Sequence, residues 1–188
     1  MPLPAALLAP DEGRWLFFDV ETRRSAEDVG GWDHIERMGL ALAVVLDAAT
    51  GELSTFHEAD VAALVDTLSA ADRVVGFNVD RFDIAVLRGH AGESVARIKT
   101  LDLLKVVHER LGFRLGLAHL CQATLGIDKS ADGMQSLQWV KEGRFDLIER
   151  YCRDDVAMTA ALWAYGRKNG YVLFRNRDGI LGRIPVKW

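Results

Sequence analysis

Two carboxylates lie two positions apart in the segment Trp15–Thr22, which reads W-L-F-F-D-V-E-T. The apolar residues before them are typical of a buried strand, and alternate residues on a strand point to the same face. Asp19 and Glu21 are therefore expected to converge on one spot, where their mutual repulsion opposes joint ionisation. A divalent metal ion would relieve this repulsion by binding both carboxylates. The alternative is a strand that runs out into an acidic surface turn.

A third acidic residue closes the segment 76–83, G-F-N-V-D-R-F-D, which follows a predicted strand. In open α/β sheets, ligands bind at such strand ends. On the helix predicted at 79–90, Asp83 shares a face with apolar residues, whereas Arg81 points away. Asp83 is therefore either a metal ligand or an acid in the first turn of a helix, where a carboxylate favours the helix dipole.

The fourth acidic residue lies on a long helix predicted at 146–167. At about 100° per residue, Asp155 falls in the apolar stripe of this helix, and its neighbour Asp154 falls on the opposite side. Burial of an unpaired carboxylate costs several kcal/mol, so Asp155 requires a cation or a dense set of hydrogen bonds. Tyr151 is one turn earlier on the same face and can reach the same place. The alternative is a structural hydrogen bond between a core tyrosine and a core aspartate.

The four acids, in the order Asp, Glu, Asp and Asp, form a recognisable set. The chain resembles the DEDD family of 3′–5′ exonucleases in the ribonuclease H-like superfamily, over about residues 15–163. The resemblance rests on F-D-V-E-T at 18–22, N-V-D-R-F-D at 78–83 and Y-C-R-D-D at 151–155. A tyrosine precedes the last acid, so the chain is similar to the Tyr subgroup, which includes the proofreading domains of B-family DNA polymerases. Within that subgroup it resembles free-standing bacterial predicted exonucleases.

The resemblance implies a metal-dependent 3′–5′ exonuclease. Such an enzyme hydrolyses terminal phosphodiester bonds of single-stranded nucleic acid to nucleoside 5′-monophosphates. DNA is favoured over RNA as the substrate, although the sequence leaves the choice between them open. By the same resemblance, Asp19, Glu21 and Asp155 bind one divalent ion. Asp19 and Asp83 then hold a second ion roughly 4 Å away, and Tyr151 orients the attacking water. Because hard oxygen ligands favour Mg²⁺ or Mn²⁺ over zinc, two such ions are the expected cofactors.

The candidate substrate-binding residues are Asn78, Arg23 and Arg24. The two arginines directly follow the strand that carries the first acids and can reach a phosphate, although exposed loop arginines are common. Phe77 and Phe82 flank the second motif and fit either base stacking or core packing, of which core packing is favoured. No chemistry is assigned to the histidines or to the two cysteines.

The elements around these motifs predict an α/β, ribonuclease H-like fold. A first strand and a hairpin at 38–46 and 52–57 give three antiparallel strands, and short parallel strands then alternate with helices. Residues 23–37 are polar and contain a Gly-Gly pair, so they are predicted to form a loop. Further strands are expected at 73–77 and 97–101, helices at 60–70, 79–90, 102–111, 115–125, 133–142 and 146–167, and a C-terminal β-hairpin at 171–175 and 180–185.

Length and composition indicate one soluble domain. The chain has 188 residues, of which 49% are hydrophobic and 27% charged, enough for one full core. A single exonuclease domain is therefore expected over 1–188, with its core at about 14–167 and the C-terminal hairpin at about 169–188. The net charge of −4 lacks the overall basicity of a nucleic-acid binder, so binding of nucleic acid requires a local basic patch.

The cysteines and the chain start bear on location. Cys121 and Cys152 fall in apolar helical patterns and are predicted to be buried and reduced. Without a signal peptide or a membrane-length apolar run, a cytoplasmic protein is expected. Its expected partners are a 3′ end of single-stranded DNA or RNA and a protein of replication or repair. No association with a membrane is expected, and the sequence leaves the oligomeric state open. The alternative functions are an endonuclease of the same superfamily and a non-catalytic nucleic-acid or protein-binding module on the same fold.

Overall fold

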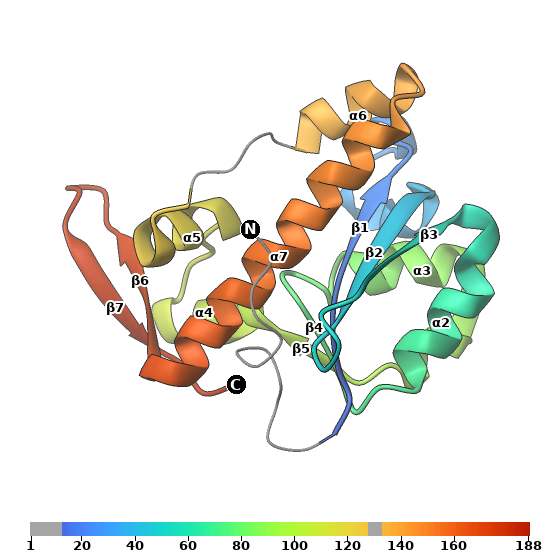
Figure 1. The fold of residues 1–188 in the computed structure, drawn as a ribbon. Coiled ribbons are helices and arrows are strands. Elements are labelled where there is room, and N and C mark those ends of the chain that lie inside the picture. Colours follow the sequence, from blue (N-terminus) through green and yellow to red (C-terminus); the bar gives the residue numbers. More distant parts are fainter. Residues whose placement is uncertain (1–12, 128–132) are drawn as a thin grey trace.

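A five-stranded mixed sheet in the order β3-β2-β1-β4-β5 forms the centre of the molecule (Figure 1). The computed structural model describes residues 13–127 and 133–188. The central strand β1 pairs antiparallel with β2 and parallel with β4, so the predicted combination of antiparallel and parallel strands is confirmed. The strands are β1 (Trp15–Thr22), β2 (Leu40–Asp47), β3 (Leu53–His57), β4 (Arg73–Gly76) and β5 (Thr100–Asp102).

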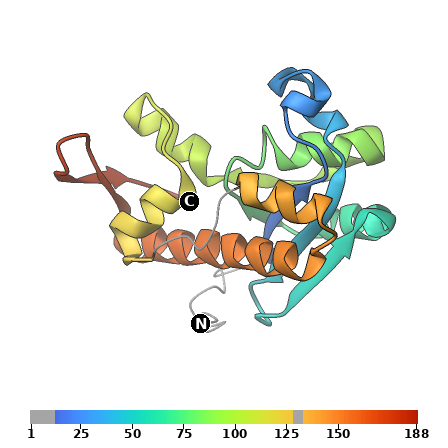
Figure 2. The ribbon, with the colours of Figure 1, turned by 90° about the horizontal axis from the view of Figure 1, so that it is seen from above.

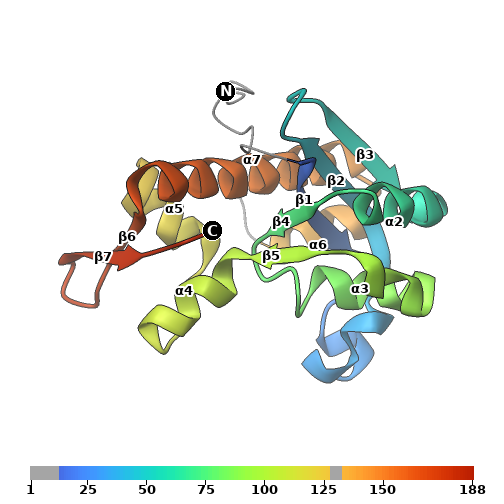
Figure 3. The same ribbon diagram turned by 90° about the horizontal axis from the view of Figure 1, so that it is seen from below.

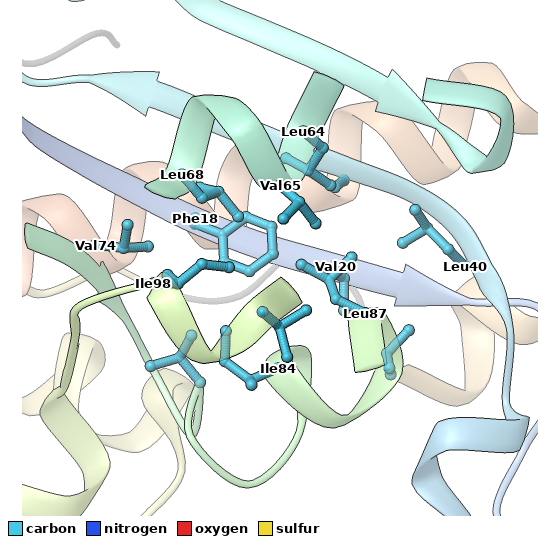
Figure 4. Packing of buried hydrophobic residues seen from close by; sticks show 14 of the residues in the cluster. Phe18, Val20, Leu40, Leu64, Val65, Leu68, Val74, Ile84, Leu87 and Ile98 are labelled. Atoms are coloured by element: carbon cyan, nitrogen blue, oxygen red, sulfur yellow. The ribbon is translucent and has the colours of Figure 1, made fainter. Parts of the chain in front are cut away.

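The side chains of β1 alternate between two hydrophobic cores. Phe18 and Val20 pack with Leu64 and Leu87 in a core on one face of the sheet, which Figure 4 shows from close by. Phe17 points to the other face, where it joins a core built on the long helix. Since Asp19 and Glu21 follow Phe17 at intervals of two, strand geometry places both carboxylates on the face of that helix.

Helices cover both faces of the sheet, and the long helix α7 crosses one of them (Figures 1 and 2). Helices α2 and α3 contribute to the core on the opposite face. Within the two described ranges, no helix combines the length and apolar character needed to cross a membrane. The helices are α2 (Val61–Ser69), α3 (Asp83–Ala91), α4 (Leu103–Leu111), α5 (Leu117–Leu125), α6 (Gly133–Lys141) and α7 (Phe145–Asn169).

The structure corrects three details of the sequence prediction. The predicted loop at 23–37 contains two 3₁₀ helices, η1 (Glu27–Val29) and η2 (Trp32–Arg37). The strand predicted at 97–101 begins only at Thr100, after the 3₁₀ helix η4 (Gly92–Arg97). The helix predicted from residue 79 begins only at Asp83, because the Asp102 carboxylate accepts the backbone N–H groups of residues 78 and 80 and so holds the preceding turn.

The predicted C-terminal hairpin is confirmed as a separate two-stranded sheet of β6 (Tyr171–Arg175) and β7 (Leu181–Pro185). Its inward residues Val172 and Ile184 join the core with Leu162 of α7. Figure 3 shows the hairpin together with α4 and α5 on the side of the molecule away from β3. Helix α7 therefore links the large sheet at its N-terminal half to the hairpin at its C-terminal end.

Candidate functional site

One cleft brings together the four acids predicted from the sequence. The cleft has a volume of about 700 Å³, and its lining includes Asp19, Glu21, Asp83 and Asp155. These residues come from β1, from the first position of α3 and from the middle of α7. Tyr151 is buried one turn before Asp155 and is hydrogen-bonded to it through the side chains.

The two acids of β1 converge as their spacing predicts. Ligand atoms of Asp19, Glu21 and Cys152 all lie within 4.8 Å of one another. The Cys152 thiol donates to the backbone oxygen and to Oδ2 of Asp19, both at 3.4 Å. Ser136 of α6 donates its hydroxyl to Glu21 Oε2 at 2.6 Å. Sequence reasoning assigned neither Cys152 nor Ser136 a place in the site, because no local pattern relates them to β1.

Asp83 lies both at the start of a helix and in the acid cleft, and its role as a metal ligand stays a prediction. It is the first residue of α3, where a carboxylate favours the helix dipole, and it also lines the cleft. Only 2% of its surface is exposed, and its Oδ1 accepts the backbone N–H of Val20 at 3.0 Å. This bond ties the start of α3 to β1 between the two strand acids.

The helical phase of α7 is confirmed. Asp155 is buried at 7% exposure, whereas the adjacent Asp154 is exposed. The ring of Tyr151 packs edge-on against Trp139 of α6, with 6.2 Å between ring centroids. Helix α6 thus covers the tyrosine on one side and contacts Glu21 through Ser136.

Burial and neighbouring negative charges raise the pKa of two acids of the cleft, Asp19 and Asp83. The pKa of Asp19 is raised well above its usual value by burial and by the negative charges of Asp83, Asp155 and Glu21, against the lowering effect of the Cys152 hydrogen bond. The pKa of Asp83 is also raised, chiefly by burial, against the effect of backbone N–H donors that include Val20. A cluster of hard oxygen donors that resists full ionisation fits a divalent cation, which would offset this repulsion.

The Tyr151 hydroxyl and the Cys152 thiol, which lie beside the acids, both remain protonated. Burial, followed by the charges of Asp155 and Glu21, raises the pKa of the Tyr151 hydroxyl above its usual value. Burial and the Asp19 charge likewise raise the pKa of the Cys152 thiol. At neutral pH both groups are therefore hydrogen-bond donors rather than anions.

The candidate substrate-binding residues occupy different places. Arg24 lines the acid cleft. Arg23 donates its Nε to the backbone oxygen of Leu40 and pairs with Glu58 at 3.0 Å, and it is not part of the cleft lining. Its predicted role in substrate binding stays a prediction that this geometry does not support.

Asn78 lies in a left-handed conformation, with φ 70°, in the turn between β4 and α3. The Asp102 carboxylate accepts its backbone N–H at 2.9 Å, and Asn78 Oδ1 accepts a hydrogen bond from Arg114 Nη2 at 2.6 Å. Sequence reasoning missed Arg114, which lies in the loop between α4 and α5. A second groove, of about 390 Å³, contains Asp19, Asn78 and Arg114 in its lining.

Aromatic side chains form one wall of the acid cleft. Phe77 and Phe82 line it and are half-buried, so each combines core packing with an exposed edge. Phe82 lies 6.4 Å from the ring of Trp32, which is 61% exposed at the cleft. This wall offers apolar surface beside the four carboxylates.

The central strand with two carboxylates, the mixed sheet around it and the covering helix α7 define a ribonuclease H-like fold. The family model of the RNase H superfamily matches residues 16–165, and the chain belongs to that superfamily. No curated protein gives a significant match.

Two solved structures are similar in fold. The family B DNA polymerase from the hyperthermophilic archaeon Pyrobaculum calidifontis has a TM-score of 0.64 and 18% identity, with 85% of this chain and 25% of the polymerase covered. Exonuclease I has a TM-score of 0.56 and 17% identity, with 84% of this chain and 41% of exonuclease I covered. The chain thus spans about a quarter and about two fifths of these proteins, and at such identity the likeness concerns the fold.

Proposed function

We propose that the protein is a metal-dependent 3′–5′ exonuclease that removes nucleotides from single-stranded nucleic acid, DNA in preference to RNA. The observation that carries the proposal is the convergence of Asp19, Glu21, Asp83 and Asp155 on one cleft. Membership of the RNase H superfamily supports it, as does the similarity in fold to exonuclease I and to a family B DNA polymerase.

The acids divide into two overlapping ligand sets. Asp19, Glu21 and Asp155 would hold one Mg²⁺ or Mn²⁺ ion, and Asp19 with Asp83 a second. When bound, the ions lower the pKa of water and neutralise charge that develops on the leaving 3′ oxygen. Because Asp19 belongs to both sets, its side chain matters most to the reaction.

Four other side chains prepare the cleft for this reaction. The Tyr151 hydroxyl stays protonated and buried beside Asp155, so it can orient the water that attacks the terminal phosphodiester. Ser136 holds one oxygen of Glu21, and the Cys152 thiol holds one oxygen of Asp19. These contacts fix the direction of the carboxylates before substrate binds. Arg24 lies at the cleft, where its charge can bind a phosphate of the strand.

The test is digestion of a 5′-labelled single strand in Mg²⁺, in Mn²⁺ and in chelator, with matched DNA and RNA sequences. The proposal predicts a ladder that shortens from the 3′ end, nucleoside 5′-monophosphates as products and no reaction in chelator. Internal cuts from the earliest times would instead identify an endonuclease. Binding without cleavage in either metal would identify a non-catalytic module.

A further inference from the structure

Basic residues gather in the last part of the chain, away from the four acids. Residues 167–188 contain six of the 23 Lys and Arg residues but only one of the 27 acidic residues. This segment is therefore strongly positive, although the whole chain has a net charge of −4. It comprises the C-terminal end of α7 and the β6–β7 hairpin (Figure 1).

The hairpin presents its basic residues on one face. Alternation along the strands places Val172 and Ile184 in the core, which leaves Tyr171, Arg175 and Arg183 on the outward face. The Arg183 guanidinium lies over the Tyr171 ring, 4.5 Å from its centroid. Exposed cations beside an aromatic ring are the combination that binds phosphates and stacks on bases in single-stranded nucleic acid.

A groove joins the acid cleft to the loop between α4 and α5. It has a volume of about 390 Å³, and its lining includes Asp19, Asp155 and Arg114. The neighbour of Arg114, Phe113, is half exposed and packs edge-on against Phe174 of β6, with 6.4 Å between ring centroids. Phe174 lies on the inward face with Val172, so this loop contacts the hairpin from its inward side. Figure 3 shows α4, α5 and the hairpin gathered on this side of the molecule.

We propose that Arg114 and Phe113, together with the exposed turn and the outward face of the β6–β7 hairpin, form a second nucleic-acid-binding surface that holds the strand upstream of its 3′ end. In this path the strand crosses the hairpin at its turn, next to Arg177, to reach the outward face. The inference rests on the proposed function, because it assigns a path to the substrate of the same cleft. Along α7, Asn169 lies about 21 Å beyond Asp155 at the helical rise per residue. A strand with duplex spacing covers this distance with about six nucleotides. The surface therefore distinguishes long strands from short ones.

The test compares the affinities of labelled thymidine oligomers of about 4 and about 16 nucleotides, which span the range of single-strand site sizes. Fluorescence anisotropy is measured in chelator, so that no strand is hydrolysed. The variant combines Arg177→Glu and Arg183→Glu, in the exposed turn and on the outward face of the hairpin. Its matched control combines Arg73→Glu and Lys99→Glu, two exposed cations at the amino ends of the parallel strands, with the same change in net charge.

The wild type should bind the longer oligomer more tightly than the shorter one. The affinity of the hairpin variant for the longer oligomer should be about 10-fold or more lower, whereas the affinity of the control should change less than about 2-fold. Loss of two phosphate contacts should also reduce the slope of log affinity against log salt by about 1.4. An equal loss in variant and control, no loss in the variant, or no length dependence in the wild type would overturn the proposal.

Two further measurements keep the interpretation unambiguous. Circular dichroism and thermal melting establish that each variant is folded. The single variant Arg177→Glu changes only the exposed turn, and it should weaken binding of the longer oligomer about 3-fold. Cleavage is assayed separately on the wild type. If the protein binds with the predicted length dependence but does not cleave, only the proposed exonuclease activity is overturned. If it cleaves but the hairpin variants bind as tightly as the wild type, only the proposed second surface is overturned.

Discussion

The acid cleft at the middle of α7 and the hairpin beyond its C-terminal end have opposite charge and opposite construction. Around Asp155, four carboxylates from three elements converge in a cleft, where burial and neighbouring negative charges raise the pKa of Asp19. Beyond the C-terminal end of α7, Arg175 and Arg183 are exposed on a hairpin whose opposite face is buried. A buried charge loses its solvation by water and needs compensating partners, whereas an exposed charge stays solvated and needs only a folded backbone to hold it. We therefore expect changes in the acid cleft to affect the chemical step and changes in the hairpin to affect substrate affinity.

The largest effect is expected for Asp19→Ala, which removes the carboxylate shared by both proposed ligand sets. Loss of several kcal/mol of transition-state stabilisation should lower the rate by about 1,000-fold or more. The fold should persist, because Asp19 contributes repulsion to the metal-free cluster. Initial rates on a 5′-labelled strand and thermal melting measure the two quantities. A folded variant that retains more than about a tenth of the wild-type rate would rule out the two-ion assignment.

Tyr151→Phe removes a hydroxyl and keeps the ring against Trp139. Since a group that orients water acts in the transition state, kcat should fall about 10- to 1,000-fold with little change in KM. The melting temperature should move by only a few degrees. Steady-state kinetics and thermal melting check both. Full specific activity in a strongly destabilised variant would show instead that Tyr151 is a structural hydrogen-bonding residue.

Ser136→Ala sharpens the comparison, since Ser136 contacts Glu21 from α6 and acts only by positioning it. A hydrogen bond to a charged group is worth about 1.5–3 kcal/mol, so kcat should fall about 10- to 100-fold. A higher concentration of Mn²⁺ should also be needed for the half-maximal rate. Ser136→Thr should restore both values in part. The control is Ser69→Ala on α2, outside the lining of the acid cleft. An unchanged metal requirement in Ser136→Ala would contradict the positioning role.

The smallest effect concerns pH and the metal-free protein. A carboxylate whose pKa is raised in the folded state destabilises that state progressively as pH rises from its unfolded value to its folded one. For Asp19 and Asp83 that window begins near 3.8 and extends upward. In chelator, the melting temperature should therefore fall by a few degrees between about pH 5 and pH 8. Saturating Mg²⁺, or Asp19→Asn, should flatten the profile; an equally steep profile in Asp19→Asn would contradict the assignment.

Sequence periodicity could predict which acids of the cleft face inward, whereas the grouping of all four in one site came from the resemblance to a known family. Asp19 and Glu21 share a strand face at an interval of two, and only one phase of α7 buries Asp155 while exposing Asp154. The mixed sheet and the terminal hairpin followed from the same alternation and from turn residues. These predictions need only local geometry.

The remaining features depend on contacts between distant segments. Ser136 and Glu21 are 115 residues apart, and Arg114 and Asn78 are 36 apart, so no local period relates them. The late start of α3 results from Asp102, at the end of β5. The 3₁₀ helices at 27–29 and 32–37 are too short to show a period. The basic character of residues 167–188 is visible in composition, but the face on which the charges lie required the structure.

The most direct measurement compares Asp155→Asn with Asp154→Asn, two adjacent residues of the same chemistry that face opposite ways on α7. Cleavage of a 5′-labelled single strand is followed in Mn²⁺, and binding of Mn²⁺ is measured by calorimetry on the same preparations. We predict that Asp155→Asn loses cleavage and binds Mn²⁺ more weakly, while Asp154→Asn stays close to wild type in both. Equal cleavage by the two variants, or loss confined to Asp154→Asn, would contradict a metal-dependent nuclease centre at the buried acids.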